Sequence, residues 1–152
     1  DAARYFNSAV SRGLSPKAFV DEMKEKNVLI PGIGHRIKSV NNPDARVAVL
    51  KAYAKKHFKK NPHLLFALEV EKLTTQKKGN LILNVDGCIA AVFLDLFDAE
   101  FSPEEKNDYV GIGVLNAFFA LGRSIGIIGH VIDQKRLKQG LFRQGWDDVL
   151  YL

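Results

Sequence analysis

The chain has 152 residues, of which 47% are hydrophobic and 26% are charged. This composition is that of an ordinary globular domain, so a disordered chain is excluded as the first expectation. The net charge of +5 suits an anionic partner, but it does not choose among nucleic acid, phosphate-bearing cofactors and polycarboxylates. Cys88 is the only cysteine, which excludes an internal disulfide and a cysteine-based metal site and favours a reducing compartment.

Serine-proline and asparagine-proline pairs predict where helices begin. Serine or asparagine accepts an unpaired N–H at the helix start, and proline at the next position gives up a donor that had no partner. The pairs are Ser15-Pro16, Asn42-Pro43, Asn61-Pro62 and Ser102-Pro103. Apolar side chains then recur at spacings of three and four residues, which puts them on one helix face. The members of these faces are Phe19, Val20 and Met23; Val47, Leu50, Ala54 and Phe58; and Leu64, Leu65, Leu68 and Val70.

The rest of the chain also favours helices. Residues 81–83 are compatible with a short strand, but Ala90–Phe97 favours a helix, and no alternating pattern with hairpin turns appears. Val110–Ile132 is apolar and long enough to cross a bilayer, although Arg123 near its centre would be costly there. Its five glycines allow close packing against other helices. We therefore expect a buried helix of a soluble protein, and a fold that is mainly α.

Two irregular segments separate the predicted helices, residues 27–42 and residues 74–80. Such connections often host function, because loops present groups that helices hold in place. In the first segment, His35 follows Gly32 and Gly34, which permit unusual backbone angles and close approach of a ligand. A histidine in this setting can act as a general acid or base. The alternative is a surface histidine beside two cationic residues.

Asp86 and Arg123 are charged residues within apolar runs. A carboxylate at position 86 is costly unless it is paired, hydrogen-bonded or used in chemistry. Asp86 or Asn84 could instead cap the helix that ends near Phe97. Arg123 is expected to be buried, where its planar guanidinium needs an anionic partner. That partner is either an internal carboxylate or a carboxylate ligand.

The remaining candidates have ordinary explanations. His57 is expected on a helix surface, His63 in a first helical turn, and His130 in a core or an interface. No pair of histidines has metal-ligand spacing supported by carboxylates. The basic run Lys55–Lys60 lacks any nucleic-acid-binding signature and is expected to be a solvated helix face. Cys88 is expected in the core.

Taken in order, these motifs resemble the citrate synthase superfamily. They are Pro31-Gly-Ile-Gly-His35, Pro43-Asp-Ala-Arg46, Asn84-Val-Asp86 and Gly122-Arg-Ser124. Longer stretches at 32–46, 67–72, 80–87 and 133–141 are similar to the C-terminal citryl-CoA lyase region of ATP-citrate lyases. The resemblance implies an all-α, citrate synthase-like fold. Residues 1–98 would form the small, CoA-side domain, and residues 99–152 would be large-domain helices that carry arginines and oligomer contacts.

The resemblance also implies a role for each matching residue. His35 and Asp86 correspond to two of three catalytic groups. The third is a histidine on an upstream segment, and none of the four histidines here matches it. The substrate carboxylates would be held by Arg46, by Arg123 and, from a partner subunit, by Arg143. Coenzyme A would be bound by Lys24, Gly32, Gly34 and Lys78.

The implied reaction is cleavage of citryl-CoA to acetyl-CoA and oxaloacetate, with coenzyme A as part of the substrate and no metal ion. The implied partners are further copies of the chain, in a dimer or tetramer, and upstream lyase modules in the cytoplasm; neither nucleic acid nor a membrane is implied. The chain lacks an initiating Met and starts within an apparent helix, so we expect a fragment that is incomplete in isolation. Citrate synthase-type condensation and a non-catalytic helical oligomerisation module stay open as alternatives.

Overall fold

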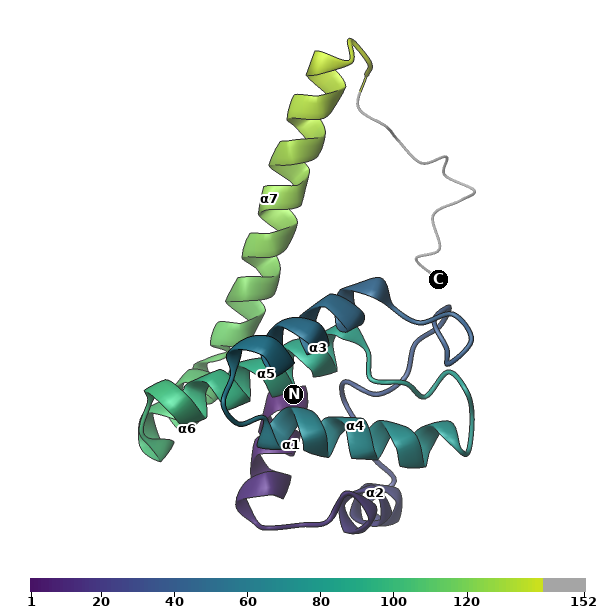
Figure 1. The fold of residues 1–152 in the computed structure, drawn as a ribbon, viewed down its shortest axis with the longest axis vertical. Coiled ribbons are helices and arrows are strands. Elements are labelled where there is room, and N and C mark those ends of the chain that lie inside the picture. Colours follow the sequence, from purple (N-terminus) through teal and green to yellow (C-terminus); the bar gives the residue numbers. More distant parts are fainter. Residues whose placement is uncertain (141–152) are drawn as a thin grey trace. The chain divides into compact units, whose positions relative to one another are not determined.

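The computed structural model describes residues 1–140, and within this range the chain is helical and forms no β-strand (Figure 1). The expected all-α class is therefore confirmed. The possible strand at 81–83 is only an isolated antiparallel bridge between Ile33 and Leu83. The helices are α1 (Ala2–Ser11), α2 (Pro16–Glu25), α3 (Ala45–His57), α4 (Pro62–Thr75), α5 (Val85–Glu100), α6 (Pro103–Ile112) and α7 (Val114–Arg136).

The chain divides into two compact units, residues 1–115 and residues 116–152. In the first unit α5 is the central helix and packs against α1, α3, α4 and α6. Its core joins Phe6 of α1, Phe19 of α2 and Phe66 of α4, whose ring centroids lie 5.5 to 6.3 Å apart. Such edge-to-face and tilted pairs add to the burial of apolar area. The predicted domain boundary between residues 98 and 99 stays a prediction.

Three of the four predicted helix starts are confirmed. Ser15 accepts the N–H of the third helical residue of α2, α4 begins at Pro62, and Ser102 forms a reciprocal capping box with Glu105. The start predicted at Asn42-Pro43 is wrong, because Asn42 is held in a turn by two backbone hydrogen bonds with Ser39. The third helix begins instead at residue 45, and its cap is an aspartate.

The predicted apolar faces are largely buried, with one error. Phe19, Val20 and Met23 lie in the core, as do Val47 and Ala54. Leu65 is 57% exposed, because the buried face of α4 runs through other positions of that helix. The core-facing residues of α4 include Leu64, Phe66, Ala67 and Val70.

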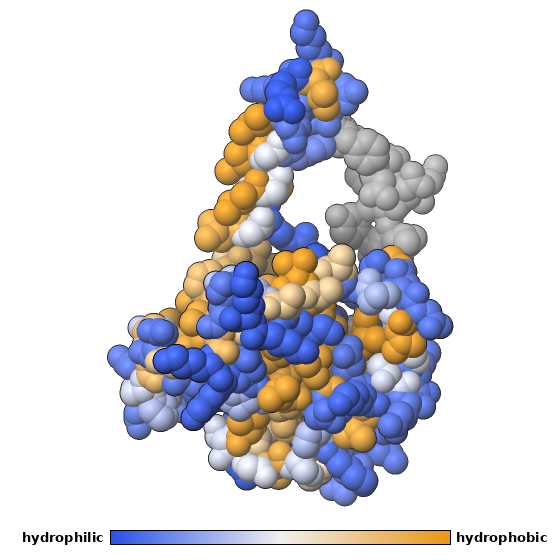
Figure 2. Space-filling view, viewed as in Figure 1, coloured by the Kyte–Doolittle hydropathy of each residue, from blue (hydrophilic) through white to orange (hydrophobic). Residues whose placement is uncertain are grey.

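The apolar stretch 110–132 is two helices and not one. Gly113 has a positive φ of 81°, a conformation that glycine adopts without strain, and it ends α6. The following helix, α7, is 23 residues long and is the one described helix long and apolar enough to cross a membrane. No residue of α7 is buried by residues 1–140, so the expectation of a buried helix is wrong within this range. Figure 2 shows apolar side chains along one side of α7 in this view.

Candidate active site

The loop that carries His35 is pressed onto the first turn of the helix that carries Asp86. Gly32 and Gly87 make this contact with their backbones. A Cβ atom on Gly32 would lie 2.6 Å from the Gly87 Cα atom, and one on Gly87 would lie 2.4 Å from the Gly32 carbonyl oxygen. Real Cβ atoms do not approach so closely. Only glycine at both positions lets the two predicted catalytic motifs meet.

Backbone hydrogen bonds fix the same loop along its length. The N–H of Gly34 donates to Ile82 (2.7 Å), and the N–H of His35 donates to Asn80 (2.9 Å). The Asn80 side-chain amide donates in return to the His35 carbonyl oxygen, at 3.0 Å. Both segments predicted to be irregular therefore meet each other. Gly34 has a positive φ of 102°, and an added Cβ atom would make only an ordinary contact with the Leu81 side chain at 3.6 Å, so its backbone angle and not its size favours glycine.

The His35 ring is oriented by the main chain that follows it. Its Nδ1 atom accepts hydrogen bonds from the N–H groups of Ile37 (3.0 Å) and Lys38 (2.9 Å). Because Nδ1 accepts, the neutral ring carries its proton on Nε2. The side chain is half-buried. Nε2 is therefore the ring nitrogen that remains for a substrate.

Asp86 is the second residue of α5, and its carboxylate is exposed. The alternative that Asp86 caps this helix is settled: Asn84 is the cap, and its side chain accepts the N–H of Gly87 at 3.0 Å. Asp86 is thus left free of the capping role. It stands at a helix N-terminus, next to the glycine contact that holds the His35 loop.

Arg46 is paired with Asp44, the buried cap of α3. The Nε and Nη2 atoms of Arg46 donate to the two carboxylate oxygens of Asp44 at 3.0 and 2.7 Å. These hydrogen bonds hold the pKa of the Asp44 carboxyl at about 2, although its burial opposes the shift. Two of the five guanidinium N–H donors are used in this pair, and three are left for an anionic ligand.

Electrostatics also links the predicted site residues. The hydrogen bonds to Asp44 raise the pKa of Arg46, and the charge of Asp86 adds to this effect. Likewise, His35 contributes to the low pKa of Asp44 after the larger effect of Arg46. His35, Asp44, Arg46 and Asp86 therefore lie within electrostatic reach of one another. Sequence reasoning had not given Asp44 a role, although an aspartate two residues before an arginine at a helix start was a signal.

The two lysines predicted to bind coenzyme A lie apart from this group. Lys24 of α2 and Lys78 are exposed. The hydrogen bond with Lys17 lowers the pKa of Asp21 in α2, and the charges of Lys77 and Lys24 add to this shift. Because Lys77 belongs to the 74–80 segment, α2 and that segment lie near each other. The roles of Lys24 and Lys78 in binding coenzyme A stay predictions.

Arg123 belongs to the second unit, where its side chain is exposed and its Cζ atom lies 4.7 Å from the Phe119 ring centroid. The expectation that Arg123 is buried is therefore wrong within the described residues, which bury no residue of α7. His130 is likewise exposed, which contradicts a core position within the described residues, while the predicted interface position stays a prediction. Arg143 lies outside the described residues.

A buried polar cluster between α4, α5 and α6 was missed by the sequence analysis. Asp95 accepts the N–H groups of His63 (2.7 Å) and Leu64 (3.0 Å) and so caps α4 from another helix. The His63 Nδ1 atom lies 3.1 and 3.2 Å from oxygens of Asp95 and Asp98, and Lys106 pairs with Asp98. The ligand atoms of His63, Asp95 and Asp98 lie within 4.8 Å of one another, close enough to hold a metal ion. Lys106 and the backbone donors already balance the carboxylates, so the cluster is explained as packing.

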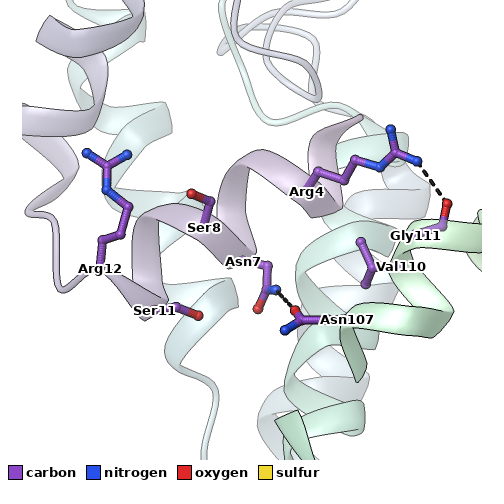
Figure 3. A pocket seen from close by; sticks show the side chains of 8 residues that line it. All are labelled: Arg4, Asn7, Ser8, Ser11, Arg12, Asn107, Val110 and Gly111. Atoms are coloured by element: carbon purple, nitrogen blue, oxygen red, sulfur yellow. Dashed lines mark hydrogen bonds between the residues drawn. The ribbon is translucent and has the colours of Figure 1, made fainter. Parts of the chain in front are cut away.

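An open groove of about 430 Å³ lies between α1 and α6 (Figure 3). Asn7 donates to Asn107 at 2.8 Å, and Arg4 donates to the Gly111 carbonyl oxygen at 2.9 Å. None of the predicted catalytic residues lines this groove. A second cavity, of about 260 Å³ between α3 and α4, includes Asp44 in its wall.

The comparison with protein families decides the family. The model of the citrate synthase C-terminal domain matches residues 2–144. The chain belongs to this family. It is 58% identical over 153 residues to a probable ATP-citrate synthase subunit 1 of Schizosaccharomyces pombe, covering 99% of this chain and 25% of that protein. The chain thus spans about a quarter of that relative's length.

Two solved structures share the fold of this family member. An ATP citrate lyase from Methanothrix soehngenii, in complex with citrate and coenzyme A, superposes with a TM-score of 0.83 and 56% identity. That match covers 100% of this chain and 25% of the lyase. A citryl-CoA lyase from Hydrogenobacter thermophilus gives a TM-score of 0.69 at 30% identity, covering 100% of this chain and 55% of that protein. The predicted citrate synthase-like fold is confirmed.

Proposed function

We propose that the chain is the C-terminal part of an ATP-citrate lyase or citryl-CoA lyase and contributes to cleavage of citryl-CoA into acetyl-CoA and oxaloacetate. The observation that carries the proposal is the contact of Gly32 with Gly87, which brings the His35 loop against the Asp86 helix. The similarity to an ATP citrate lyase solved in complex with citrate and coenzyme A supports the same substrates for this chain.

In this proposal His35 acts at the hydroxyl oxygen of the citryl group. The neutral ring carries Nε2–H, which donates a hydrogen bond to that oxygen and stabilises the negative charge that develops there as the carbon–carbon bond breaks to leave the ketone of oxaloacetate. The hydroxyl proton passes to the carboxylate of Asp86. The two N–H donors on Nδ1, from Ile37 and Lys38, hold the ring in this tautomer.

Asp86 acts at the carbon that leaves. The electron pair of the broken bond moves to the CH₂ group of the acetyl-CoA enolate, and Asp86 gives it a proton to form the methyl group. The position of Asp86 in the first turn of α5, free of the capping role, supports this assignment. Asp86 takes one proton from the hydroxyl oxygen and gives one to the carbon, so the step balances.

The arginines would neutralise and orient the substrate carboxylates. Arg46 supports this role best, because Asp44 fixes its guanidinium and leaves three N–H donors. We propose the same role for Arg123, and for Arg143 from a partner subunit. Coenzyme A would lie along Lys24 and Lys78 and against the backbone of Gly32 and Gly34, and the reaction would use no metal ion.

The exposed apolar side of α7 supports a homo-oligomer, a dimer or a tetramer. Large apolar side chains exposed on one element mark an interaction surface. Those of α7 include Leu121, Ile125, Ile127, Ile128 and Ile132. We further propose that upstream segments supply the third catalytic histidine and the ATP-handling modules, and that the protein is cytoplasmic, where the lone thiol of Cys88 stays reduced.

The test is an assay of the complete gene product that carries this chain. Citryl-CoA is supplied, and acetyl-CoA and oxaloacetate are measured, the latter by coupled reduction to malate. The reverse mixture of acetyl-CoA and oxaloacetate tests the condensation alternative. The proposal expects cleavage, and expects His35→Gln to lower it by about 10²- to 10⁴-fold. A gene product that cleaves nothing but still assembles would favour the oligomerisation module.

A further inference from the structure

Asn84 touches both motifs of the candidate site. Its side-chain Nδ2 donates to the Gly34 carbonyl oxygen at 3.0 Å, and its Oδ1 accepts the N–H of Gly87 at 3.0 Å. Its backbone N–H also donates to the Gly32 carbonyl oxygen at 2.9 Å. One residue therefore holds the loop on one side and the helix start on the other.

The two ends of this bridge are next to the proposed catalytic residues. Gly34 directly precedes His35, and Gly87 directly follows Asp86. A rotation or shift of either peptide group moves the adjacent side chain. The amide of Asn84 thus fixes the position of one proposed catalytic group with respect to the other.

The chemistry of the bridge is specific to asparagine. Serine, threonine and aspartate cap a helix about as well, because capping needs only an oxygen acceptor. The Gly34 carbonyl needs a donor, and the amide supplies donor and acceptor from one planar group. A residue that serves only as a helix cap would not need the donor that bonds the Gly34 carbonyl.

We propose that Asn84 is a positioning residue that sets the alignment of His35 with Asp86 for citryl-CoA cleavage. The inference rests on the proposed function, and it adds a residue that acts only through its neighbours. A misplacement of about 1 Å between reacting groups costs on the order of 100-fold in rate. The arginines that hold the substrate carboxylates do not depend on Asn84, so we expect the larger effect in kcat and a smaller one in KM.

The kinetic test uses Asn84→Ser in the complete gene product. Serine keeps a cap acceptor for Gly87 but cannot reach Gly34. We expect kcat for citryl-CoA cleavage to fall roughly 10- to 100-fold, with KM within about threefold of wild type. Ser15→Ala removes the cap of α2, away from the site, and controls for a general loss of helix stability. A kcat for Asn84→Ser equal to that of Ser15→Ala overturns the proposal.

A second variant covers the case in which Asn84→Ser does not fold. Asn84→Asp keeps the size and the cap acceptor but cannot donate to Gly34, so the same loss of kcat is expected. Wild-type kcat in Asn84→Asp overturns the proposal. If wild type cleaves citryl-CoA and Asp86→Asn does not, while both Asn84 variants keep full kcat, the positioning role fails and the proposed function survives.

Amide hydrogen exchange tests the bridge without any activity. Asn84→Ser is expected to speed exchange in peptides that cover both 33–38 and 85–90. Asn80→Ala is the matched comparison, because the hydrogen bonds of Asn80 to the described residues go to the His35 main chain. It is expected to speed exchange in the first peptide alone. Faster exchange in only one of the two peptides of Asn84→Ser would show that no coupling exists, whatever the reaction is.

Discussion

The site region of the first unit and helix α7 use glycine for opposite reasons. At Gly32 and Gly87 the chain itself fills the space that a side chain would need, to within 2.4 Å. At Gly122, Gly126 and Gly129 of α7, no atom of the described residues outside the helix's own nearby backbone lies within 4 Å of the added Cβ. The site motifs are explained by contacts within the chain. For α7 no such contact is present among the described residues, and the covering surface that we propose is a second copy of the chain.

The largest expected difference is in stability. Gly87→Ala should lower the free energy of unfolding by about 3 kcal/mol, because the methyl group overlaps backbone atoms of Gly32 that cannot move aside. Gly126→Ala in the monomeric chain should leave it unchanged or raise it by up to about 1 kcal/mol, through helix propensity. Urea unfolding of both variants measures the contrast. Equal losses at both positions would contradict it.

The second prediction concerns the uncovered side of α7. Ile128→Glu should raise the dissociation constant of the homo-oligomer on the order of 100-fold, since an unpaired charge within an apolar interface is costly. Light scattering at low micromolar concentration should show a smaller mass. Val49→Glu, at a similarly exposed apolar residue of α3, is the control and should leave the mass unchanged. An unchanged mass for Ile128→Glu would place the interface elsewhere.

The third prediction follows from the pKa of Asp44, about 2 in the folded chain against 3.8 for an ordinary aspartate. A lowered pKa means that the pair with Arg46 stabilises the fold above about pH 4. This contribution is lost as the pH falls from about 4 to about 2. Thermal unfolding midpoints measured across this range should fall less steeply for Asp44→Asn than for wild type. Parallel curves would show that the pair does not stabilise the fold.

The smallest effect is expected at Cys88. Burial raises the pKa of its thiol to about 11, so little thiolate exists at pH 8. Alkylation of the native chain should be on the order of 100-fold slower than that of the unfolded chain. Mass spectrometry with and without urea gives both rates. Equal rates would mean that the core around α5 opens readily.

Helix starts and unusual backbone angles were predicted from the sequence, because both depend on neighbouring residues. Ser15 and Ser102 mark helix starts because capping is a matter of neighbouring backbone groups. The prediction at Asn42 failed because its turn with Ser39 competes with the cap. Two residues later the buried Asp44 caps the helix and pairs with Arg46. Glycines beside His35 predicted unusual backbone angles. That Gly32 touches Gly87 depends on tertiary packing and was not visible in the spacing.

Long-range pairing accounts for the remaining misses. His63 was expected to be an ordinary first-turn residue, yet it is buried against carboxylates from α5, more than 30 residues away. Arg123 was expected to be buried, because apolar neighbours usually mean burial. In α7 they do not, because none of its residues is buried by the part of the chain that the structure describes.

The central claim is that Asp86 delivers the proton to the leaving carbon while the rest of α5 is scaffold. Single-turnover cleavage of citryl-CoA by the complete gene product tests it, with Asp86→Asn compared with Glu100→Gln at the other end of the same helix. The account predicts a loss of about 10²- to 10⁴-fold for Asp86→Asn, a wild-type rate for Glu100→Gln, and one solvent deuterium in each acetyl-CoA formed by wild type in D₂O. Cleavage by Asp86→Asn at the wild-type rate would contradict it.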